Sequence, residues 1–492
     1  MAPGPAVPWR TLLVVGAVAV AVRLAFFTGF QNNDDRIYAE AAWDLIRGDP
    51  QVETRLFATR VGFTGPLALL FALFGARETC LVLPALAASL ALVAMAWRMG
   101  TELASPAAGT AAALFVALLP LDVLYATSGF SDGLLAALMG GGVCLLLRTS
   151  EGPGAWALRA AAAGALWGAA HLTKESAILL LLPALPLVAG RERRRALGVA
   201  LAVLAGVVLA EGCAYASLTG DFLHRFRLAR SVQSGAGEAG SGLAGRLLSL
   251  PSFVANPLDP RFPYGGGLHA AALAGLALAL LRGRPAARAL GVWWLGSGLI
   301  LELFPQSLVP FRPAVDVQPR MLLVMTLPGA ALAGMGWSLV AAGARWPRWA
   351  AAAAAGVAML GVVRLHADAV GWRRSLEWAH GIVAERAGAV VVTDPRAAGG
   401  LRFLGGYRGA YEVLAYDPVM PAPPPGTLLF RSGRHAEQSA RLDGIVPPPW
   451  WEGPEPLLRT TVAHRRWPAP WRLRGARGPE EEAALLRVEG SR

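Results

Sequence analysis

Lysine is almost absent from this chain of 492 residues. Lysine and arginine together number 45, and only one of them, Lys174, is a lysine. Lys174 therefore marks a position where a compact, strongly hydrated ammonium replaces the usual guanidinium. Cysteine is also scarce. Cys80, Cys144 and Cys213 all lie within apolar segments, so neither a disulfide framework nor a zinc site is predicted.

Charge is low for a chain of this length. Charged residues make up 16% of the sequence and hydrophobic residues 55%, with a mean hydropathy of +0.46. This composition excludes an ordinary soluble protein and predicts a membrane protein that crosses the bilayer several times. The net charge of +12 is typical of basic loops at a membrane. No basic stretch is interleaved with aromatic residues, so no nucleic-acid partner is predicted.

Apolar runs long enough to cross a bilayer recur along the chain. The first has Arg10 before it and Arg23 within it, and we interpret it as a retained anchor, not a cleaved secretory signal. We expect about 11 transmembrane helices, near residues 11–28, 79–97, 107–127, 131–148, 156–171, 174–190, 196–214, 268–282, 288–303, 321–342 and 348–365.

Arginine clusters predict which loops are cytoplasmic. They fall at 148–159, 191–195, 282–288 and 345–348. The loops alternate consistently only if the short apolar segment 62–75 lies on the outer face without crossing. The sequence thus predicts a bacterial-type cytoplasmic (inner) membrane protein with a cytoplasmic N-terminus.

Two outer loops follow from this topology. The first, 29–78, contains juxtamembrane helices, and the second is the long loop 215–267. The second loop carries Arg225, Arg227 and Arg230, which are consistent either with interfacial anchoring or with contact to lipid phosphates.

The tail differs in composition from the rest of the chain. WRRSLEWAHGIVAERAG predicts an amphipathic helix, and AVVVTD, YEVLAY and GTLLFRSG predict short strands. We expect a transmembrane domain over 1–366 and a small α/β extracytoplasmic domain over 367–492. No Walker loop or GxGxxG motif supports nucleotide binding there.

Acidic residues at the ends of predicted spans are the first site candidates. Asp34 and Asp35 in NNDD either cap the helix that follows or do chemistry, and a cap position also orients a carboxylate. Asp132, after Ser131, has the same two interpretations. Asp122 lies inside or close to the membrane, and Asp132 ranks above it because Asp132 lies at the mouth of a span.

Two cations at predicted span ends are the next candidates. Lys174, in HLTKESAI, is either a snorkelling lysine or a phosphate ligand, and Glu175 is placed to pair with it. Arg320, in QPRMLLVM, lies at the outer end of a span and has the same alternatives.

Several segments together resemble the GT-C class of membrane glycosyltransferases. The bacterial members most similar in pattern are aminoarabinose transferases, protein O-mannosyltransferases and lipopolysaccharide galacturonosyltransferases. The segments, in the family's order, are DDRIYAEAAWDLIRGD, GFTGPLALLFALFG, SDGLLAAL, HLTKESAILLLLP and QPRMLLVMTLPGAALAG, and the resemblance covers roughly residues 10–340.

This resemblance implies transfer of a sugar from a polyprenyl-phosphate donor to an acceptor hydroxyl at the outer face, with inversion. It implies Asp34 as the base, with Asp35 or Asp132 orienting the acceptor and Tyr38 positioning substrate. Lys174 and Arg320, with Arg36 or Arg60, hold the donor phosphate. A leaving phosphate requires positive charge and an acceptor hydroxyl requires a base, so the residue types fit the chemistry.

Neither a cofactor nor a metal is predicted, and the acceptor is a lipid, a glycan or a protein. Two other functions stay open at this stage. A transporter also buries Asp and Lys among helices, although no inverted repeat is found here. A non-catalytic relative that binds a polyprenyl lipid as an assembly partner is the other alternative.

Overall fold

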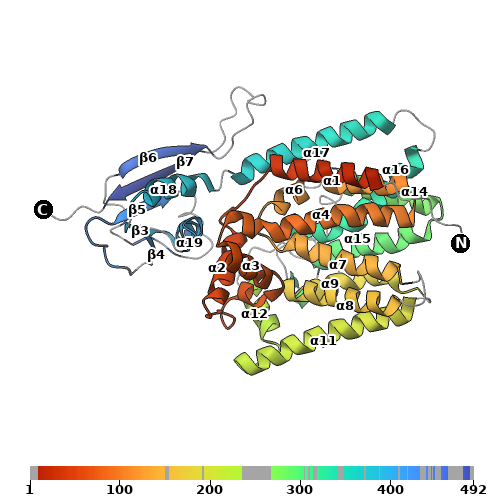
Figure 1. Cartoon of the computed structure of the whole chain (residues 1–492), viewed down its shortest axis with the longest axis horizontal. Helices are drawn as coiled ribbons and strands as arrows, with labels where there is room; N and C mark the ends of the chain where they lie inside the picture. The colour runs from red at the N-terminus through yellow and green to blue at the C-terminus, as the bar shows by residue number, and fades with distance from the viewer. Residues whose placement is uncertain are drawn as a thin grey trace. The chain divides into compact units, whose positions relative to one another are not determined.

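The structure is a computed structural model of the whole chain (Figure 1). It describes residues 9–149, 155–190, 193–234, 267–303, 305–308, 311–313, 319–341, 347–370, 373–386, 388–407, 411–417, 419–432, 439–440, 445, 447–448, 451, 456–463 and 480–487. Most of the predicted loop 215–267 therefore lies outside the described residues.

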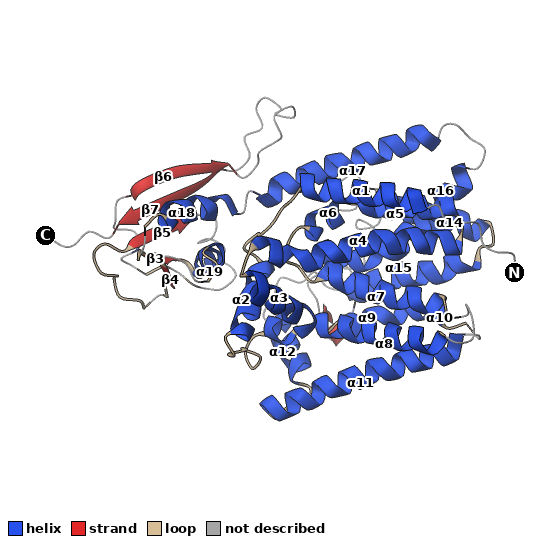
Figure 2. Ribbon diagram, viewed as in Figure 1, coloured by secondary structure: helices blue, strands red, loops and turns tan. Residues whose placement is uncertain are grey.

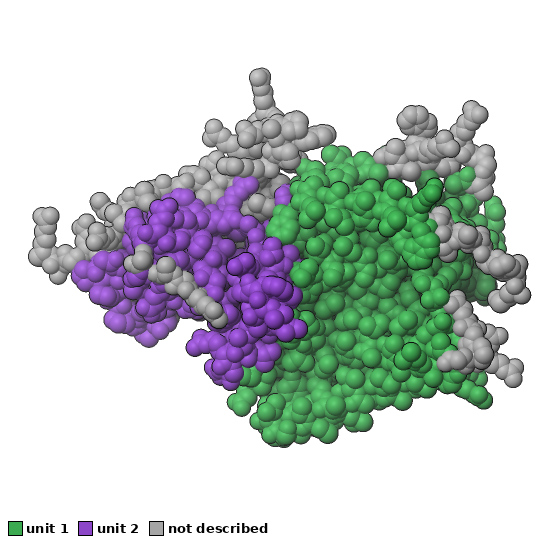
Figure 3. Space-filling view, in the orientation of Figure 1, with its two compact units in different colours: residues 1–27, 50–66, 83–365 green, residues 28–49, 67–82, 366–492 purple. Residues whose placement is uncertain are grey.

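The chain forms two compact units (Figure 3). Unit 1 comprises residues 1–27, 50–66 and 83–365, and unit 2 comprises 28–49, 67–82 and 366–492. Each unit is described by itself. The predicted domain division at 366/367 stays a prediction.

Unit 1 is built from helices (Figure 2). Helices α3, α4 and α17 each divide between the two units along the chain. The elements of unit 1, with α3 and α4, are α1 (Trp9–Ala25), η1 (Leu56–Thr59), α3 (Val61–Phe74), α4 (Glu78–Leu103), α5 (Pro106–Leu118), α6 (Pro120–Ala126), α7 (Asp132–Leu147), α8 (Trp156–Thr173), α9 (Ala177–Leu181), η2 (Leu182–Ala184), α10 (Leu185–Val188), α11 (Arg194–Thr219), α12 (His224–Ser234), α14 (Leu268–Leu281), α15 (Pro285–Leu303), η6 (Pro319–Met325), α16 (Thr326–Ala341) and α17 (Pro347–Val370). A short antiparallel pair, β1 (Pro305–Leu308) and β2 (Phe311–Pro313), precedes η6.

Every predicted span coincides with a helix or a run of short helices. Within the described residues, three helices are long and apolar enough to cross a membrane: Glu78–Leu103, Arg194–Thr219 and Arg320–Ala341. A fourth is obtained if α5 and α6, which meet at an angle of 58°, form one broken span. The count of 11 crossings stays a prediction.

Small residues let the helices of unit 1 pack closely. A Cβ added at Gly275 of α14 would lie 2.1 Å from the Leu332 carbonyl of α16, and one at Gly334 would lie 2.2 Å from the Ala108 carbonyl of α5. Close backbone approach through small residues is how helices associate where the hydrophobic effect contributes little. Helix α16, much of which is buried, lies at the centre of this packing.

A buried polar group also joins four helices of unit 1. Arg23 of α1 pairs with Asp122 of α6, and its Nε donates to the Ser89 Oγ of α4 at 2.7 Å. Its Nη1 also donates to the Ala117 carbonyl of α5 at 3.1 Å. Asp122 thus serves to satisfy a buried arginine, which accounts for a carboxylate at this depth.

Unit 2 contains α2 (Asp34–Ile46) and a small α/β layer. The layer consists of α18 (Arg374–Ala384), β3 (Val390–Thr393), α19 (Pro395–Leu404), β4 (Glu412–Ala415), β5 (Leu428–Ser432), β6 (Pro456–Ala463) and β7 (Glu480–Arg487). The strand order is β4-β3-β5-β7-β6. Strand β3 runs parallel to β4 and β5, and β7 runs antiparallel to β5 and β6.

The α/β layer in the tail confirms the small sheet predicted there. Strand residues alternate between faces: Val391, Val413 and Phe430 pack with the apolar residues of α18 and α19, and Val392 and Leu429 pack on the opposite face. Helix α19 begins sharply because Asp394 accepts hydrogen bonds from the Arg396 and Ala397 amides and is followed by Pro395.

Candidate functional site

Asp132, Lys174 and Arg320 meet in unit 1 although they are far apart in sequence. Lys174 Nζ donates to Asp132 Oδ1 at 2.6 Å, and Arg320 Nε lies 3.2 Å from Asp132 Oδ2. None of the three side chains is more than 10% exposed. The structure therefore brings three of the predicted site residues into one buried ion-pair group.

Each of these three side chains lies at an end of a helix or at a break between helices. Lys174 stands at the break between α8 and α9 in an extended conformation, and its amide donates to the Ala170 carbonyl at 2.9 Å. Arg320 lies in the 3₁₀ turn η6 that leads into α16. Asp132 is the first residue of α7. Ser131 makes no side-chain cap, so the interpretation of Ser131-Asp132 as a simple helix cap is not supported.

Glu175 does not pair with Lys174, contrary to the prediction. It pairs instead with Arg60, whose Nη2 lies 2.8 Å from Oε1 and whose Nε donates to Oε2 at 3.2 Å. Arg225 Nη2 is 3.8 Å from the same carboxylate. Consecutive side chains diverge at this helix break, which sends the Lys174 ammonium and the Glu175 carboxylate to different partners.

The ion pairs continue to α11. Arg225 Nη1 lies 2.6 Å from Glu211 Oε1, and His171 Nε2 lies 2.6 Å from Glu211 Oε2. Arg225 is therefore buried, not free at an interface as one interpretation of the basic loop segment supposed. Sequence reasoning missed Glu211, His171 and this role of Arg225. The available signal was a single carboxylate, Glu211, well inside an otherwise apolar helix.

Arg60 is held by a segment that packs closely on α8. A Cβ at Gly62 would lie 2.6 Å from the Thr173 amide nitrogen, so only glycine fits there. Tyr215 donates from its hydroxyl to the Thr59 carbonyl at 3.1 Å. The Arg60 guanidinium lies 4.8 Å from the centre of the Phe57 ring, and its charge also acts on Asp132.

Four cations, Arg60, Lys174, Arg225 and Arg320, gather here with three carboxylates, Asp132, Glu175 and Glu211. Planar guanidinium groups and an ammonium suit phosphate oxygens.

Asp34, Asp35, Arg36 and Tyr38 lie on α2 in unit 2. Asp35 is buried, and its carboxylate accepts from the amides of Gln31 at 2.5 Å, Asn33 at 2.7 Å and Arg36 at 2.9 Å. Burial raises the pKa of Asp35 to about 6, with the three hydrogen bonds acting against this shift. Asp35 thus anchors the start of α2, where Asn33 makes no side-chain cap.

The other three candidates on α2 differ in their surroundings. Asp34 is partly exposed, whereas Tyr38 is 2% exposed. Arg36 pairs with Glu40 at 2.8 Å, so its guanidinium already has a carboxylate partner. The predicted site residues therefore fall into two described groups, one on α2 and one around Asp132.

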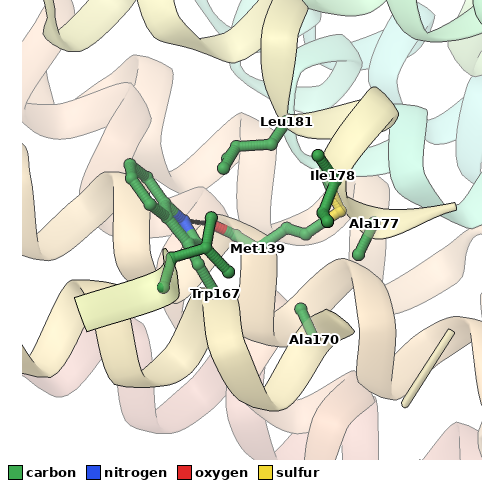
Figure 4. Close-up of a pocket in the computed structure, with 7 residues that line it drawn as sticks. Met139, Trp167, Ala170, Ala177, Ile178 and Leu181 are labelled. Carbon is green, nitrogen blue, oxygen red and sulfur yellow. Dashed lines mark hydrogen bonds between the residues drawn. The ribbon is translucent and has the colours of Figure 1, made fainter. Parts of the chain in front are cut away.

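A small apolar pocket lies within unit 1 (Figure 4). It is lined by Met139, Trp167, Ala170, Ala177, Ile178, Leu181 and Leu204. The Trp167 indole nitrogen donates to the Met139 carbonyl at 3.2 Å.

Comparisons with known proteins place this geometry in context. The family model described as dolichyl-phosphate-mannose-protein mannosyltransferase matches residues 66–214, which include Asp132 and Lys174. No curated protein matches the sequence significantly.

Solved structures share the fold. ArnT from Cupriavidus metallidurans matches in the apo state (TM-score 0.60) and bound to undecaprenyl phosphate (TM-score 0.61), each at 16% identity. The apo match covers 98% of this chain and 99% of ArnT, and the lipid-bound match covers 99% and 100%. The oligosaccharyltransferase of Archaeoglobus fulgidus, in complex with Zn and sulfate, matches at 12% identity with a TM-score of 0.52, covering 82% of this chain and 62% of that one. The predicted resemblance to the GT-C class is confirmed.

Proposed function

We propose that the protein is a glycosyltransferase that moves a sugar from a polyprenyl-phosphate donor to an acceptor hydroxyl at the outer face of the membrane. The observation that carries this proposal is the buried ion-pair group of Asp132, Lys174 and Arg320. It occurs in a fold shared with ArnT, one structure of which holds undecaprenyl phosphate.

Lys174 and Arg320 bind the donor phosphate in this proposal. Lys174 donates to Asp132 and Arg320 pairs with the same carboxylate, and a phosphate offers further acceptor oxygens to both groups. As the bond to the sugar breaks, negative charge grows on the phosphate, and preorganised cations stabilise it without reorganisation. Asp132 keeps the two cations in place before the donor arrives.

Arg60 is the third phosphate ligand in this proposal, in preference to Arg36, because Arg60 belongs to unit 1 together with Lys174 and Arg320. Each arginine has a carboxylate partner, Glu175 for Arg60 and Glu40 for Arg36. Glu175 orients Arg60.

Asp34 is the base that takes the proton of the acceptor hydroxyl. Asp34 is partly exposed, whereas Asp35 is buried and accepts hydrogen bonds from three backbone amides. Asp35 fixes the helix start that carries Asp34, and Tyr38 positions substrate. A single displacement by the acceptor oxygen then inverts the anomeric carbon.

Mass spectrometry of lipid that co-purifies with the detergent-extracted protein tests this function. The proposal expects a polyprenyl-phosphate sugar that is converted to polyprenyl phosphate when a membrane extract supplies acceptors. Bound lipid without turnover would indicate a non-catalytic assembly partner. Uptake of the sugar lipid into proteoliposomes without cleavage would indicate a transporter. Absence of any bound phospholipid of this class would contradict the proposal.

A further inference from the structure

The segment that leads into α2 is held by residues from the C-terminal part of unit 2. Arg373 Nη1 donates to the Thr28 carbonyl at 3.0 Å and pairs with Glu78. Glu78 Oε1 in turn accepts from the Phe30 amide at 2.6 Å. Arg373 is fixed from its own side because its Nε donates to Glu377 at 2.7 Å.

Two adjacent glycines of α19 provide a close contact for α2 and its approach. A Cβ added at Gly399 would lie 2.4 Å from Arg36 Cδ and 2.5 Å from Glu40 Oε1. One added at Gly400 would lie 2.7 Å from Asn32 Oδ1. All three distances are well below van der Waals contact, so a side chain at either position would displace a neighbouring side chain of this segment.

Aromatic rings complete the contact at both ends of the segment. The Phe30 and Phe403 rings have centroids 4.4 Å apart, and Trp43 stacks on Tyr407 at 5.2 Å. Asn32 and Tyr407 both have positive φ angles, of 58° and 57°. Left-handed backbone at non-glycine residues persists only where the surroundings fix it.

We propose that Arg373, Gly399, Gly400, Phe403 and Tyr407 form a clamp that sets the conformation of residues 28–36 and so positions the two acidic side chains at the start of α2. The Asp35 carboxylate bonds to amides within 31–36, so those bonds exist only while this stretch keeps its shape. The role of the C-terminal layer is thereby assigned: it orders the acidic segment. Its consequence for turnover rests on the proposed function, but the ordering itself does not.

Hydrogen exchange of the full-length protein tests the clamp. Gly400→Leu places a side chain where the Asn32 amide and the Leu376 Cδ1 now lie, and Gly381→Leu is the matched control because nothing lies within 4 Å of a Cβ at Gly381 in α18. Leucine favours helix over glycine at both positions, so neither change melts its own helix. We expect amides of residues 28–36 to exchange at least tenfold faster in Gly400→Leu and at the wild-type rate in Gly381→Leu.

Two further measurements distinguish a loss of order in residues 28–36 from a loss of folding in the whole protein. Binding of undecaprenyl phosphate should be unchanged in Gly400→Leu, whereas kcat for sugar transfer should fall with little change in the donor KM. If Gly400→Leu does not fold, Arg373→Gln, which removes the Glu78 pair, takes its place with the same expectation. Wild-type exchange at residues 28–36 in the folded variant would overturn the clamp. A wild-type protein without turnover would overturn the proposed function and leave the exchange result as the test of the clamp.

Discussion

Lys174 donates a hydrogen bond to Asp132 at 2.6 Å, and the two residues are 42 positions apart in sequence. The single lysine of an arginine-rich chain thus meets a carboxylate at the first residue of α7, and Arg320 joins the same carboxylate. Removing one member of a buried ion pair leaves a charge without compensation. Replacing any one residue of this group should therefore change a quantity that can be measured.

Replacing Lys174 tests the phosphate site. Lys174→Met should weaken binding of undecaprenyl phosphate by roughly 10- to 150-fold, the effect of one lost charge-assisted hydrogen bond. Arg227→Gln is the control because Arg227 is 72% exposed and pairs only across the surface with Asp221. Titration of lipid into both purified variants measures the difference. Equal affinities would show that Lys174 does not touch the phosphate.

Replacing Asp34 tests the proposed base. Asp34→Asn should lower kcat for transfer by roughly 10²–10⁴-fold, the usual contribution of a positioned base. Lipid binding and the thermal unfolding midpoint should stay as in the wild type, because Asp34 is partly exposed and Asp35 supports the helix start. Full transfer activity in the purified Asp34→Asn protein would remove Asp34 from the mechanism.

The ion pair of Arg60 and Glu175 predicts a stability difference. Glu175→Gln leaves the buried Arg60 guanidinium beside a neutral amide, whereas Arg225 keeps its pair with Glu211, and breaking such a buried pair costs about 3–5 kcal/mol. Glu102→Gln is the control, because its pair with Arg98 is more exposed and should contribute less than about 1 kcal/mol. Unfolding midpoints of the two variants in one detergent give the comparison. Equal midpoints would mean that the pair does not stabilise the fold.

Asp35 predicts a pH dependence. Its pKa is about 6 in the folded chain against 3.8 for the free side chain, because burial disfavours the carboxylate. Between these values the folded protein holds a proton that the unfolded chain has lost. Stability therefore falls as pH rises through this window, by about 3 kcal/mol at most.

Thermal unfolding of the wild type and of Asp35→Asn, compared at about pH 4.5 and about pH 7, measures the stability that is lost when Asp35 gives up its proton. The wild-type midpoint should decline relative to that of the variant as pH rises. Parallel behaviour of the two proteins would show that Asp35 titrates normally.

Metal independence is the remaining prediction. The phosphate is met by lysine and arginine in this account, so EDTA should leave transfer unchanged. In the stretches that the structure describes, no group of three or more His, Cys, Asp or Glu side chains is arranged to hold a metal ion. Activity lost in EDTA and restored by Mg²⁺ or Mn²⁺ would contradict this expectation.

The helices were predictable because the length of each apolar run can be read from the sequence. The ion-pair partners of the charged side chains could not be predicted in this way. Charge counting placed Asp132, Lys174 and Arg320 near one face of the membrane, yet it gave no distances, and the structure shows them in contact. Glu175 follows Lys174 in sequence, but the break between α8 and α9 turns its carboxylate toward Arg60.

The contacts of α2 were also beyond sequence reasoning. NNDD predicted a cap, and the carboxylate that satisfies the helix start is Asp35, from inside the first turn. The contribution of Gly399 and Gly400 depends on a segment more than 350 residues away along the chain, and nothing in the local pattern of either segment indicates that contact.

The most direct test of the central claim is the release of polyprenyl phosphate by the purified protein loaded with its co-purified sugar lipid. We predict that a membrane extract supplying acceptor hydroxyls triggers this release in the wild type and in Arg227→Gln, and that Lys174→Met releases little. Release at the same rate from Lys174→Met, or no release from the wild type, would contradict the account.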